Sequence, residues 1–260
     1  MMIWKVGQLE KHLVVDIEQL SREPYSTILC YPRASKDEVK KRLRQLAKIK
    51  VTAFEFVGYK QVLNLQILGK GCVGLVVLAQ RDDKHVALKI RRIDADRLGM
   101  QREAKLLSMA NSVEIGPRLL DVSKDFLVME FVDGNLLPEW LVKTRSKRHV
   151  KTILREILEQ CWQLDRIGLD HGELSHAPKH IMVNREGRPV LVDFETASMN
   201  RRSSNVTSIC QFLFLGSEVA EIIAKKIGVI DKNDIVEALR RYKKDSNRER
   251  FELVLSACRF

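Results

Sequence analysis

The chain has 260 residues, 45% hydrophobic and 30% charged, which is enough apolar material for two or three compact units with buried cores. No apolar run approaches the roughly 20 residues that span a bilayer, and the start of the chain lacks a signal-peptide pattern, so we expect a cytoplasmic protein with no membrane partner. The formal net charge of +11 makes nucleic acid a candidate partner, although many soluble proteins are basic for solubility alone, and the five scattered cysteines show no Cys-x-x-Cys pair that would suggest zinc.

Residues 1–60 are predicted to form a small α/β unit with a basic helix. The segments 27–31 and 51–57 have the composition of strands. Between them, Ser35 and Glu38 form a capping-box sequence that marks a helix start. The helix has an apolar stripe made of Val39, Leu43 and Leu46. Its remaining surface is predicted to be basic, with Lys36, Lys40, Lys41, Arg42, Arg44 and Lys48. This face is either a solvated surface or an RNA contact, and both interpretations stay open.

A glycine-rich turn between two predicted strands follows within residues 65–93. Gly69, Gly71 and Gly74 stand in the pattern G-x-G-x-x-G-x-V, which ends at Val76. Glycines let backbone amides approach phosphate oxygens that side chains would otherwise block. The same pattern occurs in plain turns and in dinucleotide-binding folds, but in the latter it opens a helix, whereas the residues after Gly74 are apolar and β-prone. We therefore expect a hairpin that covers phosphates.

A lysine closes the next apolar strand, Val86-Ala87-Leu88-Lys89, where a fixed ammonium group would contact the α- and β-phosphates of a nucleotide. The helix predicted over 95–110 carries Glu103 in an inward position, which makes it the expected partner of Lys89. Lys89 alone would be explained as a lysine that extends its charge from a strand end into water. A strand predicted over 126–132 then leads into Gly134, an arrangement that lets backbone groups pair with an adenine edge.

The second half of the chain carries two carboxylates suited to phosphoryl transfer. A long helix is predicted over 147–167, and His171-Gly172-Glu173 follows it. Two short strands are predicted over 181–183 and 190–192, and Asp193 comes directly after the second. The turn and strands can bring Glu173 and Asp193 together, one to orient a hydroxyl and one to hold Mg²⁺. Each acid alone is equally well explained as an ordinary residue at the end of an element. From about residue 203 the chain is predicted to be helical.

These motifs, from about residue 65 to 198, resemble the protein kinase superfamily, and most of all its atypical branch, which includes the RIO kinases. The run His171-Gly172-Glu173-Leu174-Ser175-His176, with Asp193-Phe194-Glu195 after it, is similar to an archaeal family that includes an RNA kinase acting on a ribose 2′-hydroxyl of tRNA. The resemblance implies an α+β, protein-kinase-like bilobal fold. It would have an N-lobe sheet with one helix over 61–134 and a reduced helical C-lobe over 135–260, preceded by the α/β unit of 1–60.

The resemblance also implies ATP and Mg²⁺ as cofactors, with Mn²⁺ as a substitute. The implied catalytic residues are Lys89, Glu173 and Asp193. The implied ATP contacts are Gly69, Gly71, Gly74, Val76, Ala87, Lys89, Glu103, Glu130 and Val132. Asp193 is the implied main metal ligand, with His180 as a second, although histidine is a poor ligand for Mg²⁺. Three residues depart from the usual kinase pattern, because Glu173 replaces an aspartate, His180 stands near the place of an asparagine, and Glu195 replaces a glycine.

The residues after Asp193 bear on the substrate, since they contain no A-P-E signature or long activation segment of the kind that holds peptides. They are rich in cations, which are Arg201, Arg202, Lys225, Lys226, Arg240, Arg241, Lys243, Lys244, Arg248 and Arg250. With the basic segment 143–148, they suit a phosphate backbone better than a peptide. We therefore expect an ATP-dependent RNA kinase that phosphorylates a ribose 2′-hydroxyl of tRNA. The alternatives are an atypical RIO-like Ser/Thr protein kinase and, favoured only by the three departures, a nucleotide- or RNA-binding pseudokinase.

Overall fold

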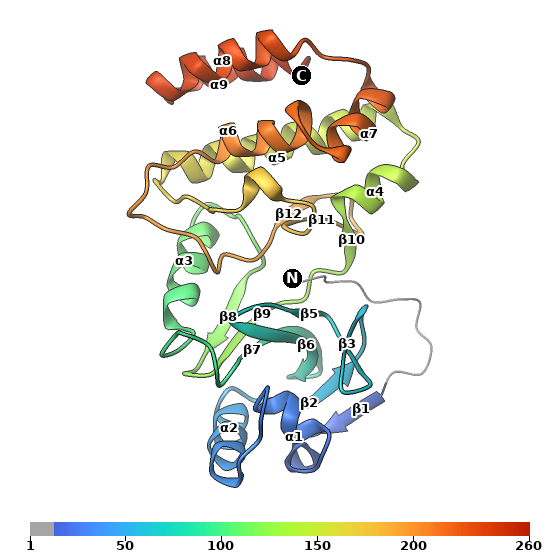
Figure 1. Ribbon diagram of the computed structural model, residues 1–260, viewed down its shortest axis with the longest axis vertical. Coiled ribbons are helices and arrows are strands. Elements are labelled where there is room, and N and C mark those ends of the chain that lie inside the picture. Colours follow the sequence, from blue (N-terminus) through green and yellow to red (C-terminus); the bar gives the residue numbers. More distant parts are fainter. Residues whose placement is uncertain (1–12) are drawn as a thin grey trace. The chain divides into compact units, whose positions relative to one another are not determined.

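The computed structural model describes residues 13–260, so the first twelve residues, in which the sequence shows no signal-peptide pattern, lie outside the described residues. The chain forms two compact units. The first runs to Asn111 and resumes over Pro117–Gly134, and the second comprises Ser112–Gly116 and Asn135–Phe260. Figure 1 shows the strands gathered mainly in the first and the long helices in the second.

The first unit is built on a seven-stranded sheet whose strands follow the order β1-β2-β6-β7-β9-β8, with β5 paired to β6. All of its pairings are antiparallel. The strands of the sheet are β1 (Leu13–Asp16), β2 (Val51–Phe56), β5 (Gly69–Lys70), β6 (Gly74–Arg81), β7 (Lys84–Arg91), β8 (Leu119–Val122) and β9 (Phe126–Glu130). Strands β3 (Lys60–Val62) and β4 (Leu65–Ile67) form a separate hairpin.

The β6–β7 hairpin lies at the centre of this sheet and positions the glycine-rich turn. Asp82 and Asp83 connect its strands with φ angles of 48° and 58°, as a two-residue hairpin turn of the left-handed kind requires. The strand interiors are buried, which explains their almost uninterrupted apolar sequence. At the other end of the hairpin Gly74 pairs with Arg91, so the glycine-rich turn lies beside the last residues of β7.

The helices of the first unit are the 3-10 helix η1 (Ile17–Ser21), α1 (Tyr25–Leu29), α2 (Lys36–Lys48) and α3 (Gln101–Asn111). The predicted helix start at Ser35 is confirmed, because the Glu38 amide donates a hydrogen bond to the Ser35 hydroxyl at 3.3 Å. The predicted strand over 27–31 is wrong. The carboxylate of Glu23 accepts hydrogen bonds from the hydroxyls of Ser26 and Thr27, and this local contact together with burial of the next residues favours helix α1 over an extended chain.

Two further expectations for this unit need correction. Arg42, predicted on the exposed basic face of its helix, is fully buried, because several oxygen acceptors surround its guanidinium group. Helix α3 begins at Gln101 and not at residue 95, since the chain before it makes irregular contacts such as the hydrogen bond from the Met100 amide to the Lys124 carbonyl.

The second unit is mainly helical and carries one small sheet of order β10-β11-β12. Its strands are β10 (Gly134–Leu136), β11 (Ile181–Asn184) and β12 (Pro189–Leu191). Its helices are α4 (Leu137–Lys143), α5 (Lys147–Arg166), the 3-10 helix η2 (Leu174–His176), α6 (Asn205–Cys210), the π-helix η3 (Gln211–Leu215), α7 (Glu218–Ile227), α8 (Lys232–Lys244) and α9 (Arg248–Ala257). Helix α5 matches the prediction, and its apolar stripe, which includes Val150, Ile153, Ile157 and Leu164, forms the core of the unit.

The predicted α+β class is confirmed by these two units, an antiparallel sheet with a few helices and a helical unit with a small sheet. Among the described residues, no single helix is long and apolar enough to cross a membrane. One pair of helices within residues 13–260, Asn205–Leu215 and Glu218–Ile227, meets the same criteria of length and composition together but is bent by 72° at its break.

Candidate active site

The glycine-rich turn closes tightly over the side chain of Lys89. Gly69 and Lys70 pair with Val76 and Leu75, and the Gly71 amide donates to the Gly74 carbonyl at 2.8 Å. A Cβ atom on Gly74 would lie 2.8 Å from the Ile90 carbonyl oxygen and 3.2 Å from Cγ of Lys89. The third glycine of the motif is therefore required by close packing, since it lets the strand pass directly over the lysine.

Lys89 and Glu103 form the buried ion pair that the sequence predicts. The Nζ atom of Lys89 donates to Oε1 of Glu103 at 2.7 Å, and both side chains are almost inaccessible to water. Strand β7 supplies the lysine and the first turn of α3 supplies the glutamate. A charge at this depth is tolerated only when it is paired, so each residue fixes the position of the other. The pair holds one ammonium group beneath the glycine-rich turn, and the contact of this group with phosphate oxygens stays a prediction.

The remaining residues predicted to contact ATP lie on the same sheet. Val76 and Ala87 are buried on β6 and β7, and Val76 pairs directly with Lys89. Glu130 ends β9, and its amide donates to the Arg118 carbonyl at 2.8 Å. Any pairing of adenine at this residue therefore depends on its carbonyl oxygen. Val132 is buried just beyond the strand. Their assignment as nucleotide contacts remains a prediction.

In the second unit, the loop after α5 is held by a buried polar network that the sequence analysis missed. The side chain of Asn205 accepts a hydrogen bond from the His171 amide at 2.9 Å and donates to the Leu169 carbonyl at 2.7 Å. Asn205 is in turn held by Asp165, which also accepts a hydrogen bond from Tyr242 at 3.0 Å. Burial raises the pKa of Asp165 despite these donors. Asp165, an acidic residue on the apolar face of helix α5, was the one feature of the sequence that pointed to this network.

His171 connects this loop to the end of β12. Its ring is fully buried, and Nε2 lies 3.2 Å from the Val192 carbonyl oxygen. Burial lowers the pKa of His171 to about 4, and the nearby His180 acts in the same direction. The ring is therefore neutral near pH 7, and Nε2 must carry the proton that is donated to the carbonyl. The ring of Phe194, 4.9 Å away between centroids, packs against it.

Glu173 and His180 form a close pair in the same unit. Oε2 of Glu173 lies 2.8 Å from Nε2 of His180. The Nδ1 atom of His180 is buried and has no hydrogen-bond partner among the described residues. From the sequence, Glu173 is predicted to face the acceptor hydroxyl and His180 to bind a second metal, with no contact between them. The structure joins the two side chains, and the metal role of His180 stays a prediction.

Asp193 adopts an unusual backbone conformation for a residue that carries a side chain. Its φ angle is 69°, in the left-handed region, while its neighbours Val192 and Phe194 are buried. Such a conformation costs free energy and is found preferentially at functional sites. The carboxylate is close enough to His171 to oppose the lowering of its pKa. Glu173 thus contacts His180 and Asp193 acts on His171, and the two histidine rings lie 5.7 Å apart between centroids.

The donor set can be tested for Mg²⁺. Within residues 13–260, no group of three or more His, Cys, Asp or Glu side chains is arranged to hold a metal ion. Mg²⁺ is commonly bound by one or two carboxylates together with substrate phosphates, so a complete cage from the protein is not needed. Asp193 fits this requirement. His180 is less suited to it, because imidazole nitrogen is a poor ligand for this cation.

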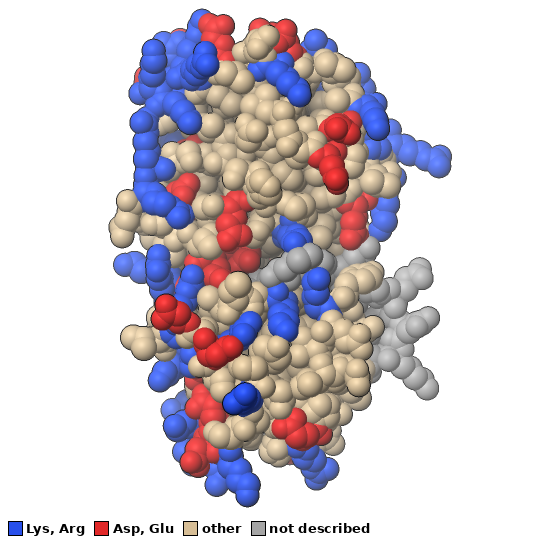
Figure 2. Space-filling view, in the orientation of Figure 1, with Lys and Arg blue, Asp and Glu red and all other residues tan. Residues whose placement is uncertain are grey.

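The second unit also has a cavity lined by cations. Its volume is about 600 Å³. It is lined by Lys147, Arg148, Lys151, Thr152, Arg155, Arg259 and Phe260. No acidic residue belongs to this set, and in Figure 2 further Lys and Arg side chains gather at the left edge of the part that carries α8 and α9. Several of the C-terminal cations are engaged within the unit, among them Arg201 with Asp170, Arg241 with Glu237, and Arg248 with Glu159.

The antiparallel sheet with its buried lysine–glutamate pair, and the helical unit that presents Asp193 and Glu173, define a protein-kinase-like protein. A family model described as the RIO domain matches residues 77–207, half of the chain. The chain therefore belongs to the RIO domain family. This confirms the predicted kinase-like fold and the atypical branch of the superfamily.

Three curated relatives match parts of the chain. An uncharacterized protein of Methanocaldococcus jannaschii is 28% identical over 45% of this chain and 99% of its own length. The serine/threonine-protein kinase YabT of Bacillus subtilis is 30% identical over 45% of this chain and 36% of its own. The KEOPS complex subunit Bud32 of Pyrococcus abyssi is 30% identical over 38% of this chain and 44% of its own. Thus the match spans nearly all of the first relative but less than half of the other two.

Proposed function

We propose that this protein binds ATP and transfers the γ-phosphate to a ribose 2′-hydroxyl of a tRNA nucleotide. The kinase part of the proposal is carried by one observation, the buried contact between Lys89 and Glu103 at 2.7 Å beneath the glycine-rich turn. Membership of the RIO domain family supports the same activity. The RNA part is supported by the basic surface and by the resemblance of the His171–Glu173 segment to the archaeal RNA kinase family.

In this proposal each site residue has a separate task. Lys89 contacts the α- and β-phosphates, and the amides of the glycine-rich turn approach the phosphate oxygens. Asp193 would hold Mg²⁺, or Mn²⁺ in its place, and the ion would neutralise charge on the transferred phosphoryl group. Glu173 faces the substrate hydroxyl, and His180, whose Nε2 atom lies 2.8 Å from Oε2 of Glu173, holds the glutamate in position. Catalysis then consists chiefly of positioning and charge stabilisation.

The cavity lined by cations supports a substrate with a phosphate backbone. None of its five cations forms an ion pair with an acid in the described part of the chain, and Lys151 donates to the Arg259 carbonyl. Such a group is favourable when it neutralises phosphates and releases their counterions. The exposed side chains of Lys40, Lys41 and Arg44 on α2 offer a further basic surface in the first unit. A peptide acceptor would give no reason for this concentration of positive charge.

A Ser/Thr protein kinase activity is the second candidate. It is favoured by the relatives YabT of Bacillus subtilis and ppk11 of Schizosaccharomyces pombe, which are named serine/threonine-protein kinases and are each 30% identical over the matched region. A pseudokinase role is disfavoured, because the structure retains the paired Lys89 and presents Asp193 in a strained conformation.

The deciding experiment offers γ-labelled ATP with tRNA, with a protein acceptor such as casein, and with a pool of metabolites in separate reactions. We expect label on tRNA. Alkaline hydrolysis then locates it, because RNA cleavage by base requires a free 2′-hydroxyl, so a nucleotide phosphorylated there stays joined to its 3′ neighbour as a labelled, alkali-resistant fragment. Label on casein and none on tRNA would replace the RNA kinase with the protein kinase.

A further inference from the structure

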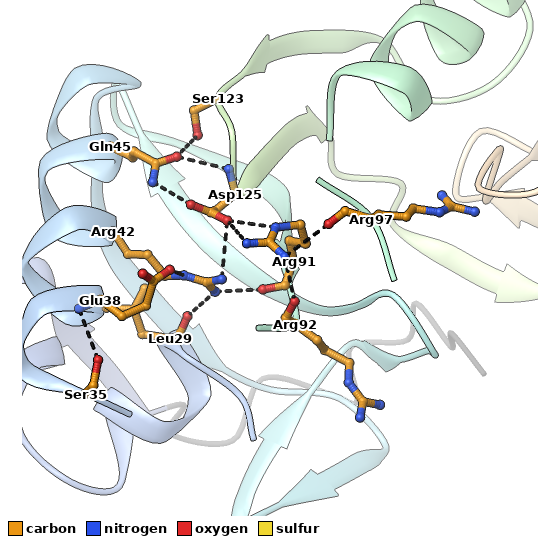
Figure 3. A network of polar contacts seen from close by, with 10 residues as sticks. All are labelled: Leu29, Ser35, Glu38, Arg42, Gln45, Arg91, Arg92, Arg97, Ser123 and Asp125. Atoms are coloured by element: carbon orange, nitrogen blue, oxygen red, sulfur yellow. Dashed lines mark hydrogen bonds and ion pairs between the residues drawn. The ribbon is translucent and has the colours of Figure 1, made fainter. Parts of the chain in front are cut away.

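A buried network of hydrogen bonds and ion pairs joins the segment that carries α1 and α2 to the end of strand β7 (Figure 3). Nη1 of Arg42 donates to the carbonyl oxygens of Leu29 and Arg91, each at 2.7 Å. Asp125 accepts from Nη2 of Arg42 at 3.3 Å, from Nε of Arg91 at 2.8 Å and from the side-chain amide of Gln45 at 2.7 Å. The network therefore fixes the backbone of Arg91, two residues beyond Lys89.

The next residue, Arg92, extends this contact to the glycine-rich turn. Its amide donates to the Val73 carbonyl at 2.8 Å, and its Nη1 atom donates to the Gly71 carbonyl at 3.2 Å. Two of the residues between Lys70 and Gly74 are thus held by a single arginine. Asp94 accepts two hydrogen bonds from the same guanidinium group, at 2.6 and 2.8 Å, and sets its orientation.

Tyr31, which follows α1, completes the contact from the other side. Its hydroxyl accepts a hydrogen bond from Nζ of Lys70, within the glycine motif, at 2.6 Å. The ring lies beneath two cations, with Lys70 at 4.6 Å and Arg92 at 5.2 Å from its centroid. The Tyr31 carbonyl also accepts from the Ile93 amide at 2.9 Å. One aromatic residue from the N-terminal segment therefore contacts Lys70 in the turn and Arg92, the arginine that holds Gly71 and Val73.

We propose that Tyr31 and Arg92 are positioning residues that hold the glycine-rich turn in its nucleotide-binding conformation. We call the segment that carries α1 and α2 the clamp, because its contacts hold the turn in place. Glycines give the turn the freedom to approach phosphates, but the same freedom must be lost when a nucleotide is bound. A turn that is already ordered loses less conformational entropy on binding. The inference rests on the proposed function, since it assumes that the turn binds the phosphates of ATP.

Amide hydrogen exchange reports on the clamp without any need for activity. The Gly71 amide donates to the Gly74 carbonyl and the Arg92 amide donates to the Val73 carbonyl, each at 2.8 Å. An amide hydrogen exchanges only when its hydrogen bond opens, so the exchange rates of these two amides measure how readily the turn opens. Mass spectrometry of the peptides that contain them assigns the rates.

The experiment compares the full chain with Tyr31→Phe, Tyr31→Ala and Arg92→Lys. Tyr31→Phe deletes only the hydroxyl that holds Lys70, while Arg92→Lys keeps the charge but loses the paired contacts to Asp94 and Gly71. The matched control is Tyr25→Phe, which removes a hydroxyl from a tyrosine stacked on Phe56 in the same unit, with 5.5 Å between ring centroids. Thermal unfolding of each variant shows whether the unit remains folded.

We expect the Gly71 and Arg92 amides to exchange about twofold faster in Tyr31→Phe and roughly tenfold faster in Tyr31→Ala and Arg92→Lys, with Tyr25→Phe unchanged. The KM for ATP should rise in the same order while kcat stays within about twofold. Equal exchange rates in the parent, Tyr31→Phe and Arg92→Lys would overturn the clamp, even where Tyr31→Ala fails to fold. Slower exchange of these amides with ATP is a separate arm, because its absence in the parent would refute nucleotide binding at the turn while the rates without ATP still decide the clamp.

Discussion

Replacing Lys89 by methionine tests both the stability of the first unit and its proposed chemistry. The side chain is 1% exposed and its ammonium group lies 2.7 Å from Glu103. Lys89→Met leaves this carboxylate buried without its ammonium partner, and loss of one member of a buried pair costs about 3–5 kcal/mol. At about 2–4 °C per kcal/mol, the melting temperature should fall by roughly 6–20 °C. Phosphoryl transfer should fall at least about 100-fold, because the developing charge loses a fixed cation.

The double variant Lys89→Met/Glu103→Gln separates these two effects. It removes both charges, so most of the lost stability should return, as is seen when buried ion pairs are replaced as a whole. Activity should not return, because the cation is still missing. Lys84→Met, an exposed lysine at the start of the same strand, is the matched control and should change neither property. The reasoning is refuted if Lys89→Met unfolds at the parental temperature or if the double variant transfers phosphate at a near-parental rate.

The other predictions concern the second unit, the buried network and the basic cavity. Glu173→Gln should lower kcat at least about 30-fold, and His180→Asn should lower it by a similar factor. The double variant should be no less active than either single variant, and additive losses would show that the two residues do not act as one pair. The hydrogen bond from Gln45 and the neighbouring arginines outweigh burial and lower the pKa of Asp125, so its contribution to stability is present above about pH 4 and is lost as the pH falls through its folded pKa. Acid unfolding of Asp125→Asn should therefore depend less on pH below about pH 4 than that of the parent, and parallel curves would contradict this assignment. Finally, the logarithm of the affinity for tRNA should fall linearly with the logarithm of the salt concentration. A variant that combines Lys147→Glu, Arg148→Glu and Arg155→Glu reverses three cavity cations and should flatten this slope by about three. An unchanged slope would show that the cavity does not contact the RNA.

The sequence predicted best those parts of the fold that depend on local pattern. The apolar spacing of 147–167 and the alternation of glycines with β-prone residues after Gly69 led directly to α5 and to the β5–β6 turn. The Lys89–Glu103 contact was also predicted, because strand, helix and charge each allow few alternatives. What these features share is that the information lies within a few turns or strands of the chain.

Most of what the sequence did not show depends on contacts between residues far apart in the chain. Arg42 appeared to belong to a basic face, since helical periodicity places it between lysines, and its burial depends on acceptors up to 83 residues away. The strand expected over 27–31 became helix α1 for a local reason, the acceptor Glu23, that β-propensity does not include. Likewise, the pairing of Glu173 with His180 requires the fold of the loop between them. Charge and periodicity alone do not encode such partners.

The left-handed conformation of Asp193 has a consequence for how this protein can evolve or be engineered. Glycine adopts a φ of 69° without strain and asparagine does so more readily than most residues, so Asp193→Gly or Asp193→Asn would relieve backbone strain at the cost of the contacts that the carboxylate makes. Selection for an unstrained backbone alone would therefore drive this position away from the carboxylate. Persistence of the acid in a population of variants would then report selection for phosphoryl transfer, and its loss would be an early sign of a lineage turning into a binding protein.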